Sequence, residues 1–153
     1  MNHEPILIRN ATLTDLPHIV AFNERLTWES EHRRLDHETL TRGVQRVLTQ
    51  PALGRYFVAE AGSEVVGQTM LTYEVTDWRD GLVYWIQSVY VHQDYRRRGV
   101  FRHLYEHVLS VARDAGDVRA IRLYVEKDNH GAVQAYQKLG MSLAHFHIYE
   151  RDL

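Results

Sequence analysis

The spacing of apolar residues changes abruptly in the second half of the chain, and this change restricts the fold more than any other sequence feature. Residues 82–91 are rich in Val, Tyr, Trp and Ile, which is typical of a β-strand. From Val100 to Val111 apolar residues recur every three or four positions, which predicts an amphipathic helix ending near Gly116. Aliphatic residues occupy every second position of residues 121–125, as is typical of a strand. This order predicts a right-handed crossover that joins two parallel strands.

The segments on either side of this unit predict one mixed sheet. Two segments, 56–59 and 65–75, are separated by Gly62-Ser63 and predict a pair of strands joined by a turn. Further strands are expected at 6–9 and 144–149. Helices are expected at 16–26 and 129–139, and a third helix begins at Asp36 and is stopped by Pro51 and Gly54. The expected fold class is therefore α/β (α+β mixed), with helices on both faces of the sheet.

Length and composition exclude several classes of protein. The chain has 153 residues, enough for one hydrophobic core, and we expect a single domain over residues 1–153. A net charge of −2 gives no support for a nucleic-acid partner. The chain has no cysteine, which excludes disulfides and thiolate chemistry. No apolar run approaches the roughly 20 residues of a membrane span, and the first residues lack a signal-peptide pattern. We expect a cytoplasmic protein without membrane partners.

A basic turn with one glycine joins the strand at 82–91 to the following helix. The N-terminus of a helix carries unpaired N–H groups and a partial positive charge, so it favours a phosphate or pyrophosphate. Gly99 allows the backbone to come close to such an anion. Four arginines can add charge-assisted hydrogen bonds, namely Arg96, Arg97, Arg98 and Arg102. The turn lacks the Gly-Lys-Ser/Thr of a nucleotide P-loop and the glycines of a dinucleotide fingerprint.

This turn resembles the signature of the GCN5-related N-acetyltransferases (the GNAT superfamily), which is Gln/Arg-x-x-Gly-x-Gly/Ala after a strand. Here the turn is Arg96-Arg97-Arg98-Gly99-Val100-Phe101, which matches at the first four positions and has Phe101 where the family has a small residue. The second family pattern, Asn-x-x-Ala-x-x-x-Tyr-x-x-x-Gly-Phe, is met by Asn129, Ala132, Tyr136 and Gly140, with Met141 at the last position. The motifs occur in the family's order, so the resemblance covers nearly the whole chain.

The resemblance implies an enzyme that transfers an acetyl group from acetyl-CoA to a primary amine by direct attack in a ternary complex. It implies a mostly antiparallel sheet of six to seven strands, whose central parallel pair splays apart around the pantetheine arm. It also implies that Tyr136 protonates the leaving thiolate, since a phenol with a pKa of about 10 is a suitable donor. The residues implied in cosubstrate binding are Val89, Tyr90, Val91, Arg96, Arg97, Arg98, Gly99, Val100, Phe101, Arg102 and Asn129. Phe101 either crowds the pyrophosphate or points into the core, and Asn129 also suits a helix cap.

The acceptor is less well defined by the resemblance. Family members build its pocket from the first two helices, the middle strands and the last strand, where carboxylates and aromatic faces suit a cationic amine. This implies a small amine, diamine or amino-acid-like acceptor, with Glu29, Glu74, Asp77, Trp78 and Trp85 as candidate residues. The charges around Glu29 equally fit a solvated helix face. Glu74, Asp77, His92 and a water chain all remain open for deprotonating the amine. By the same resemblance, residues 144–149 could pair across a homodimer.

Three other functions fit single motifs. A non-catalytic acyl-CoA sensor or an inactive partner subunit would bind CoA without turnover, and Phe101 is the residue that favours it. His103, Glu106 and His107 match the zinc-peptidase motif H-x-x-E-H, which would suit a zinc hydrolase. No third ligand is indicated, however, and no metal is expected. A nucleic-acid interface would need more than the arginines at 96–98. Added zinc or a chelator tests the zinc hydrolase, and turnover on an amine tests the acyl-CoA sensor.

Overall fold

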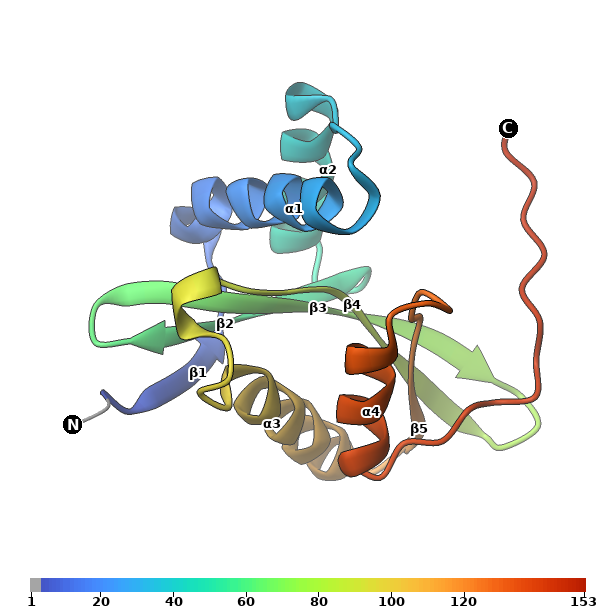
Figure 1. Ribbon diagram of the computed structural model, residues 1–153. Coiled ribbons are helices and arrows are strands. Elements are labelled where there is room, and N and C mark those ends of the chain that lie inside the picture. The colour runs from blue at the N-terminus through green and yellow to red at the C-terminus, as the bar shows by residue number, and fades with distance from the viewer. Residues whose placement is uncertain (1–3) are drawn as a thin grey trace.

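A computed structural model describes residues 4–153, and its elements follow the predicted order as far as α4 (Figure 1). The strands are β1 (Ile6–Asn10), β2 (Gly54–Ala61), β3 (Glu64–Thr76), β4 (Gly81–Val91) and β5 (Val118–Leu123). The helices are α1 (Leu16–Glu31), α2 (His37–Thr49), α3 (Val100–Ala115) and α4 (His130–Lys138). Two short 3-10 helices, η1 (Leu13–Asp15) and η2 (Gln93–Tyr95), precede α1 and α3.

The strands form one mixed sheet in the order β1-β2-β3-β4-β5. Neighbours are antiparallel from β1 to β4, whereas β4 and β5 are parallel and are joined through α3. Helices α1 and α2 lie on one face of the sheet, and α3 and α4 lie on the other (Figure 1). The predicted α/β (α+β mixed) class is therefore confirmed. None of the helices within residues 4–153 combines the length and the apolar character that crossing a membrane requires.

Two hydrophobic layers hold the helices to the sheet. Phe57 of β2 packs with Leu71 and Leu104 on the side of α3, whereas Tyr56 and Val58 pack beneath α1 and α2. Because successive side chains of a strand point to opposite faces, one apolar stretch supplies both layers. The two layers place α1 and α3 on opposite sides of β4, where the candidate site lies.

The predicted last strand at 144–149 is wrong. After α4 the chain passes Gly140, whose φ is 88°, and continues without regular structure (Figure 1), with the ring of Phe146 5.6 Å from the guanidinium of Arg122 of β5. Four of its large apolar side chains are exposed, namely Leu143, Phe146, Ile148 and Tyr149. Alternating apolar residues form a strand only where a second strand supplies hydrogen bonds. No strand of the described chain pairs with this segment, so the sheet has five strands there instead of six to seven.

Candidate active site

The parallel strands β4 and β5 separate partway along their length. Their backbone pairing ends at Ile86 and Leu123, where β5 stops, while β4 continues to Val91. On the side of β5, the backbone of residues 87–91 therefore has no partner strand in the part of the chain that the structure describes. An unpaired strand edge offers a row of N–H and C=O groups to a ligand. This is the splayed pair expected from the resemblance, and the predicted residues 89–91 lie on its free edge.

A β-bulge lies where β4 leaves β5. Ser88 and Val89 of β4 lie opposite Thr69 alone in the register of β3 and β4. Ser88 has a φ of 51°, a conformation that residues other than glycine rarely adopt. A bulge redirects the strand that contains it and is common beside functional sites. The directions of the N–H groups that follow Ser88 therefore depend on this bulge.

The turn between β4 and α3 presents backbone donors to an anion. Gly99 caps α3 with a φ of 78°, and Arg97 is also left-handed, at 64°. Within the described part of the chain, the N–H groups of residues 98–102 donate no hydrogen bond. A Cβ at position 99 would meet only His103, at 3.7 Å, so conformation rather than lack of space requires the glycine. These N–H groups and the positive end of the α3 dipole suit a bound anion.

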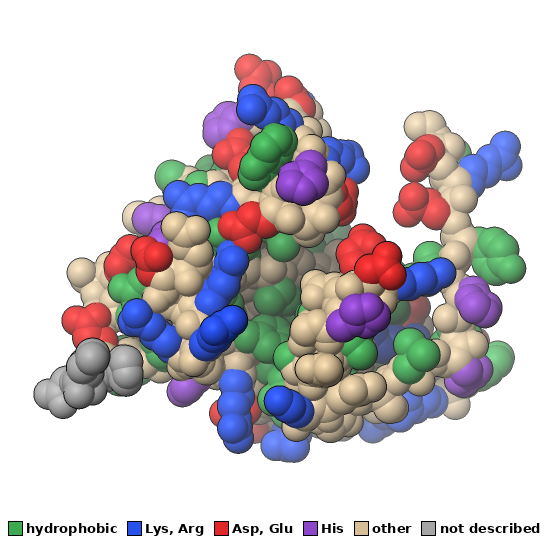
Figure 2. Space-filling view, viewed as in Figure 1, with side chains coloured by type: hydrophobic (Ala, Val, Ile, Leu, Met, Phe, Trp, Pro, Cys, Tyr) green, Lys and Arg blue, Asp and Glu red, His purple; other side chains and the backbone are tan. Residues whose placement is uncertain are grey.

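A pocket of about 280 Å³ lies over this turn. All but one of its lining residues were predicted to bind the cosubstrate, the exception being Tyr95; the lining is Val91, Tyr95, Arg96, Arg97, Gly99, Val100, Phe101 and Arg102. Figure 2 shows basic side chains gathered at the turn, beside a hollow with a hydrophobic floor. Val89, Tyr90, Arg98 and Asn129 lie outside the lining. The structure thus brings most of the predicted binding residues together.

Arg96 is held by the last turns of α1. Its guanidinium donates to Glu29 and, at 3.0 Å, to the carbonyl oxygen of Val91, and it lies 5.5 Å from the centre of the Tyr90 ring. Glu29 also accepts a hydrogen bond from the hydroxyl of Tyr90 at 3.0 Å. Glu29, predicted as an acceptor-binding residue, therefore ties α1 to the anion-binding turn. Tyr90 is buried and its backbone pairs with Gln68 of β3, so the free edge is formed by the backbones of Val89 and Val91.

The other three arginines of the turn have different surroundings. Arg98 lies 5.0 Å from the centre of the Tyr95 ring, and Arg102 forms an ion pair with Glu106 at 2.8 Å. Within residues 4–153, the side chain of Arg97 forms neither a hydrogen bond nor an ion pair. Arg97 is exposed at the rim of the pocket, so its guanidinium is the most readily available of the four for a phosphate group.

Helix α4 carries two of the predicted residues. The Oδ1 of Asn129 accepts a hydrogen bond from the N–H of Ala132 at 3.1 Å, so Asn129 caps the helix. Tyr136 packs edge-on against Phe101 of α3, with ring centres 5.6 Å apart. Burial raises the pKa of Tyr136 above the usual value of 10.0, so its hydroxyl stays protonated at neutral pH, as a proton donor requires.

Phe101 occupies the position where the family has a small residue, and it packs between two helices. Its ring lies 6.2 Å from that of Tyr105, on the same helix, as well as against Tyr136. It belongs to the half-buried residues around the core on the α3 side. Of the two expectations for Phe101, packing toward the core is the one observed, although part of the residue also lines the pocket.

The predicted acceptor residues do not form one cluster. Trp85 stacks on Tyr124 with ring centres 4.6 Å apart. Glu74 pairs with Arg122 at 3.0 Å, and the guanidinium of Arg122 lies 5.9 Å from the centre of the Trp85 ring. These four side chains come from β3, β4, β5 and the residue after β5. They form a small aromatic and charged group on one face of the sheet.

The remaining acceptor candidates lie farther along the β3–β4 hairpin. An Oδ1 atom of Asp77 accepts a hydrogen bond from the N–H of Trp78 at 2.9 Å, and Trp78 is 94% exposed in the turn. An indole so exposed forms no wall of a pocket. His92, a candidate for deprotonating the amine, lies just beyond the end of β4. Its Nδ1 atom accepts a hydrogen bond from the N–H of Asp94 at 3.3 Å.

Arg122 and Tyr124 were missed in the sequence, although one signal was present. Alternation along β5 places residues 122 and 124 on the same face, and Arg122 lies beside Trp85 in the parallel register. The register between two parallel strands is absent from the sequence itself. A second signal was the polar pair Gln68-Thr69 between the apolar residues Val66 and Met70, both polar residues being fully buried.

The three residues of the zinc motif have separate partners. The Nδ1 of His103 is hydrogen-bonded to a backbone carbonyl at 2.8 Å, and Glu106 pairs with Arg102. The ring of His107 packs edge-on against Phe57, with centres 4.7 Å apart. Over residues 4–153, no three side chains of His, Cys, Asp or Glu are grouped as a metal site would need.

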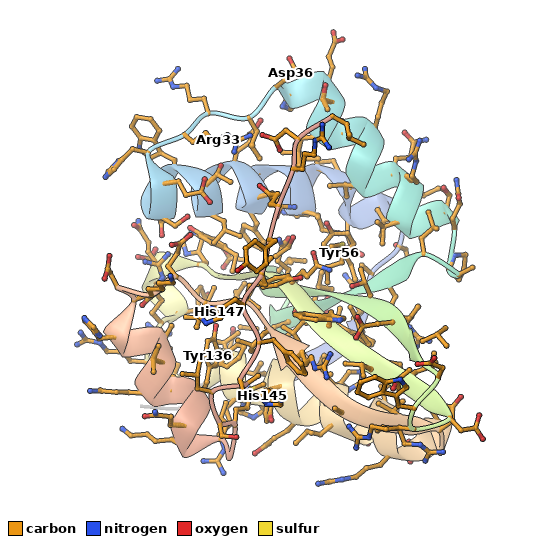
Figure 3. All side chains as sticks on the ribbon, turned by 90° about the vertical axis from the view of Figure 1, so that its right-hand side faces the viewer. Arg33, Asp36, Tyr56, Tyr136, His145 and His147 are labelled. Carbon is orange, nitrogen blue, oxygen red and sulfur yellow. The ribbon has the colours of Figure 1, made fainter. Side chains whose placement is uncertain are left out.

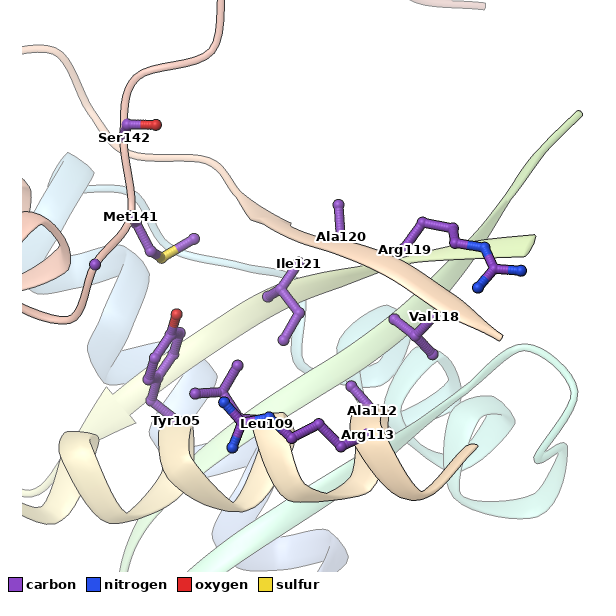
Figure 4. Close-up of a pocket in the computed structure, with 11 residues that line it drawn as sticks. Tyr105, Leu109, Ala112, Arg113, Val118, Arg119, Ala120, Ile121, Met141 and Ser142 are labelled. Carbon is purple, nitrogen blue, oxygen red and sulfur yellow. The ribbon is translucent and has the colours of Figure 1, made fainter. Parts of the chain in front are cut away.

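A second pocket, of about 400 Å³, lies between α3, β5 and residues 140–142 (Figure 4). Its lining includes the apolar Leu109, Ile121 and Met141 and the charged Arg113 and Arg119. None of the predicted cosubstrate or acceptor residues lines it. It borders the edge of β5 that faces away from β4.

Comparison with known proteins agrees with this geometry. A model of the acetyltransferase (GNAT) family matches residues 14–141. The chain is 33% identical over 128 residues to a mycothiol acetyltransferase of Corynebacterium aurimucosum, a match covering 82% of this chain and 42% of that protein. The chain therefore spans less than half the length of that curated relative.

Solved structures resemble the whole described chain. A possible acetyltransferase from Clostridium difficile 630 is 40% identical, with a TM-score of 0.91 and coverage of 98% of this chain and 99% of that one. A predicted acetyltransferase from Clostridium acetobutylicum, solved with acetyl-CoA, has a TM-score of 0.80 over 96% of each chain; at 18% identity the likeness is one of fold. Since the family model matches well over half of the residues, the chain belongs to the acetyltransferase (GNAT) family, whose cosubstrate is acetyl-CoA.

Proposed function

We propose that this protein transfers the acetyl group of acetyl-CoA to a primary amine by direct attack in a ternary complex. The observation that carries the proposal is the course of β4. Its free edge runs from the opening beside β5 directly into the turn where residues 98–102 have N–H groups without acceptors in the described chain. A strand edge pairs with amides and a helix N-terminus binds pyrophosphate. Acetyl-CoA contains both groups and supplies the acetyl thioester.

Each part of the site has a separate task in this proposal. The N–H groups of residues 98–102 hold the pyrophosphate, with Arg97 adding a charge-assisted hydrogen bond. The backbone of residues 89–91 holds the pantetheine arm, and one of its N–H groups stabilises the negative charge that develops on the thioester oxygen. The amine loses a proton to a water chain, its nitrogen forms the new N–C bond at the thioester carbon, and the C–S bond then breaks as the charge on the oxygen collapses. Tyr136 donates its proton to the sulfur that leaves.

The cosubstrate is tested by thermal unfolding with and without acetyl-CoA, with NAD as the control. A ligand at 100 times its Kd adds about 2.7 kcal/mol to the free energy of unfolding, which raises Tm by roughly 5–10 °C for a chain of this size. We expect this rise with acetyl-CoA alone, followed by thiol release on a panel of primary amines. No rise at millimolar acetyl-CoA would contradict the proposed cosubstrate, and a rise without thiol release would favour the acyl-CoA sensor.

We infer that the acceptor binds over the aromatic pair Trp85 and Tyr124, because this stacked pair lies on the face of β4 and β5 close to where the strands separate. Trp85→Ala is expected to raise the KM for the amine about tenfold, since an aromatic contact with a cation or an apolar body contributes roughly 1 kcal/mol or more. The Kd for acetyl-CoA should not change. Trp85→Phe keeps an aromatic face and should stay close to the wild type. A change in the Kd for acetyl-CoA instead of the KM for the amine would place the residue elsewhere.

We also propose that the protein forms a homodimer through residues 143–149. The outer edge of β5 has no partner strand in the described chain, and β5 has six residues, the length of the segment 144–149. The pocket of Figure 4 lies along that edge and offers apolar side chains to a strand placed there. Burying the four exposed apolar side chains of two such tails removes on the order of 1,000 Å² from water, the size of a specific interface.

The dimer is tested by light scattering coupled to gel filtration. We expect twice the chain mass of 18.0 kDa for the wild type and a monomer once residues 143–153 are removed. Removing residues 151–153 alone is the matched control and should leave the dimer intact. A monomeric wild type at tens of micromolar would contradict the proposal, whatever the activity.

A further inference from the structure

A glutamine is buried at the centre of the sheet, beside the bulge of β4. Gln68 of β3 is fully buried, and it lies opposite Val58, on the face that α1 covers. Its Nε2 donates to the Oδ1 of Asn23 at 3.3 Å and to the carbonyl oxygen of Ser88 at 3.1 Å. Asn23, on α1, is itself only 6% exposed. One amide group therefore connects a helix, a central strand and the bulge.

Folding alone does not explain this amide. The Oε1 of Gln68 is buried without a hydrogen-bond partner in the described chain. A buried polar atom without a partner destabilises the folded state. The neighbours on the same face, Val58 and Met70, are apolar, so a methionine at position 68 would pack there without that loss. Polar residues kept in such positions are typical of functional sites.

The hydrogen bond from Gln68 acts on a strained residue. Ser88 has a φ of 51°, where the Cβ of an L-residue is crowded, so an extended backbone is preferred unless other contacts oppose it. Relaxing the bulge would shift the register of β4 by one residue and turn Tyr90 away from Glu29. The buried hydroxyl of Tyr56 lies beside Asn23 and Ser88, and burial raises its pKa, so this neighbour stays uncharged. Tyr56 is labelled in Figure 3 beneath α1.

We propose that Gln68 is a positioning residue that keeps the bulge at Ser88 in its strained form, with Asn23 orienting its amide. The bulge in turn directs the N–H groups of Val89 and Val91 into the opening between β4 and β5, while Tyr90 stays paired with β3. The effect on the bulge stands independently, whereas the effect on acetyl transfer rests on the proposed function. Gln68 touches no reacting atom and acts only by donating a hydrogen bond to a carbonyl oxygen.

The bulge is tested first by amide hydrogen exchange, measured by NMR without ligand. Gln68→Met removes the donor and nearly keeps the side-chain size. We expect the amides of Gln87 and Tyr90, which pair with β3 on either side of the bulge, to exchange about tenfold faster or more, while the paired amides of residues 82–86 keep their rates. Adding Ser88→Gly should restore most of the protection, because glycine adopts a positive φ without strain.

The consequence for the reaction is tested in the same variants. Gln68→Met is expected to lower kcat about tenfold while the Kd for acetyl-CoA changes less than about threefold, because a misdirected N–H group weakens the stabilisation of developing charge. The infrared stretch of the isotope-labelled thioester carbonyl should move toward its frequency in water. The double variant with Ser88→Gly should recover most of both values.

Val58→Ala is the matched control, since Val58 lies directly opposite Gln68 in the register of β2 and β3 and is also fully buried. It should lower Tm and leave the exchange of residues 87–91 and kcat unchanged. Asn23→Ala is a second variant, which keeps Gln68 but removes its anchor, and it should show the same signature at smaller size. Unchanged exchange in Gln68→Met, or equal effects in Val58→Ala, would overturn the inference. Failure of the wild type to bind acetyl-CoA would overturn the proposed function. The role of Gln68 at the bulge would then be decided by the hydrogen-exchange result alone.

Discussion

Replacing Tyr136 with phenylalanine is expected to lower kcat for acetyl transfer by about 100-fold, the typical contribution of a positioned general acid. The Kd for acetyl-CoA should stay within about twofold of the wild type, because the ring and its edge-on contact with Phe101 remain. The loss corresponds to about 2.7 kcal/mol in the barrier. Stopped-flow measurement of thiol release, with a separate binding titration, distinguishes the two parameters.

The pH dependence of this reaction distinguishes a proton donor from a packing residue. Burial raises the pKa of Tyr136 above 10.0, and a donor acts only in its protonated form. At neutral pH the wild-type hydroxyl is therefore fully competent, and kcat should fall only as the pH rises through the raised pKa. The phenylalanine variant has no such group, so this alkaline decline should be missing from its profile.

Tyr105→Phe is the control for Tyr136→Phe. Tyr105 also lies beside Phe101 and burial likewise raises its pKa, but it is on α3 and lines the second pocket. Removing the hydroxyl of Tyr105 should change kcat by less than about twofold. Equal losses in the two variants would mean that the effect is structural. An unchanged rate in Tyr136→Phe would show that the acid role is wrong.

Replacing Gly99 with aspartate is expected to raise the Kd for acetyl-CoA by about 100-fold, the second large effect. The Cβ has room there, since the nearest atom is 3.7 Å away, and aspartate tolerates a positive φ better than most residues. The loss therefore comes mainly from a negative charge placed against the pyrophosphate, and like charges in contact cost several kcal/mol. Calorimetric titration with CoA and acetyl-CoA measures it directly.

Gly99→Asn separates charge from conformation. Asparagine has the same shape as aspartate and tolerates the left-handed region, so it should raise the Kd only several-fold, through strain and partial blocking of the N–H groups. The difference between aspartate and asparagine should shrink at high salt, because screening weakens the repulsion. Equal Kd values for the two variants would mean that no phosphate group binds at this turn.

The order of helices and strands was readable from the sequence because its signals are local. The change from a β-rich run to helical spacing at Val100, and the glycine at 99, act within a few residues of one another. The same holds for α4, where Asn129 caps the helix and Tyr136 follows two turns later. Local spacing fixes such elements, and with them the anion-binding turn and the candidate acid.

The tertiary structure decided which predicted residues meet. Glu29 and Arg96 are 67 positions apart, and only the packing of α1 on β4 brings them together, which places Glu29 at the anion-binding turn. The bulge at Ser88 depends on a hydrogen bond from another strand, and the position of Arg122 beside Trp85 depends on a parallel register. Apolar and polar residues alternate along the segment 144–149, as in a strand, but this alternation is only one of the two conditions that a strand must meet. The other is a partner edge, and partner edges are set by the folded chain and its neighbours.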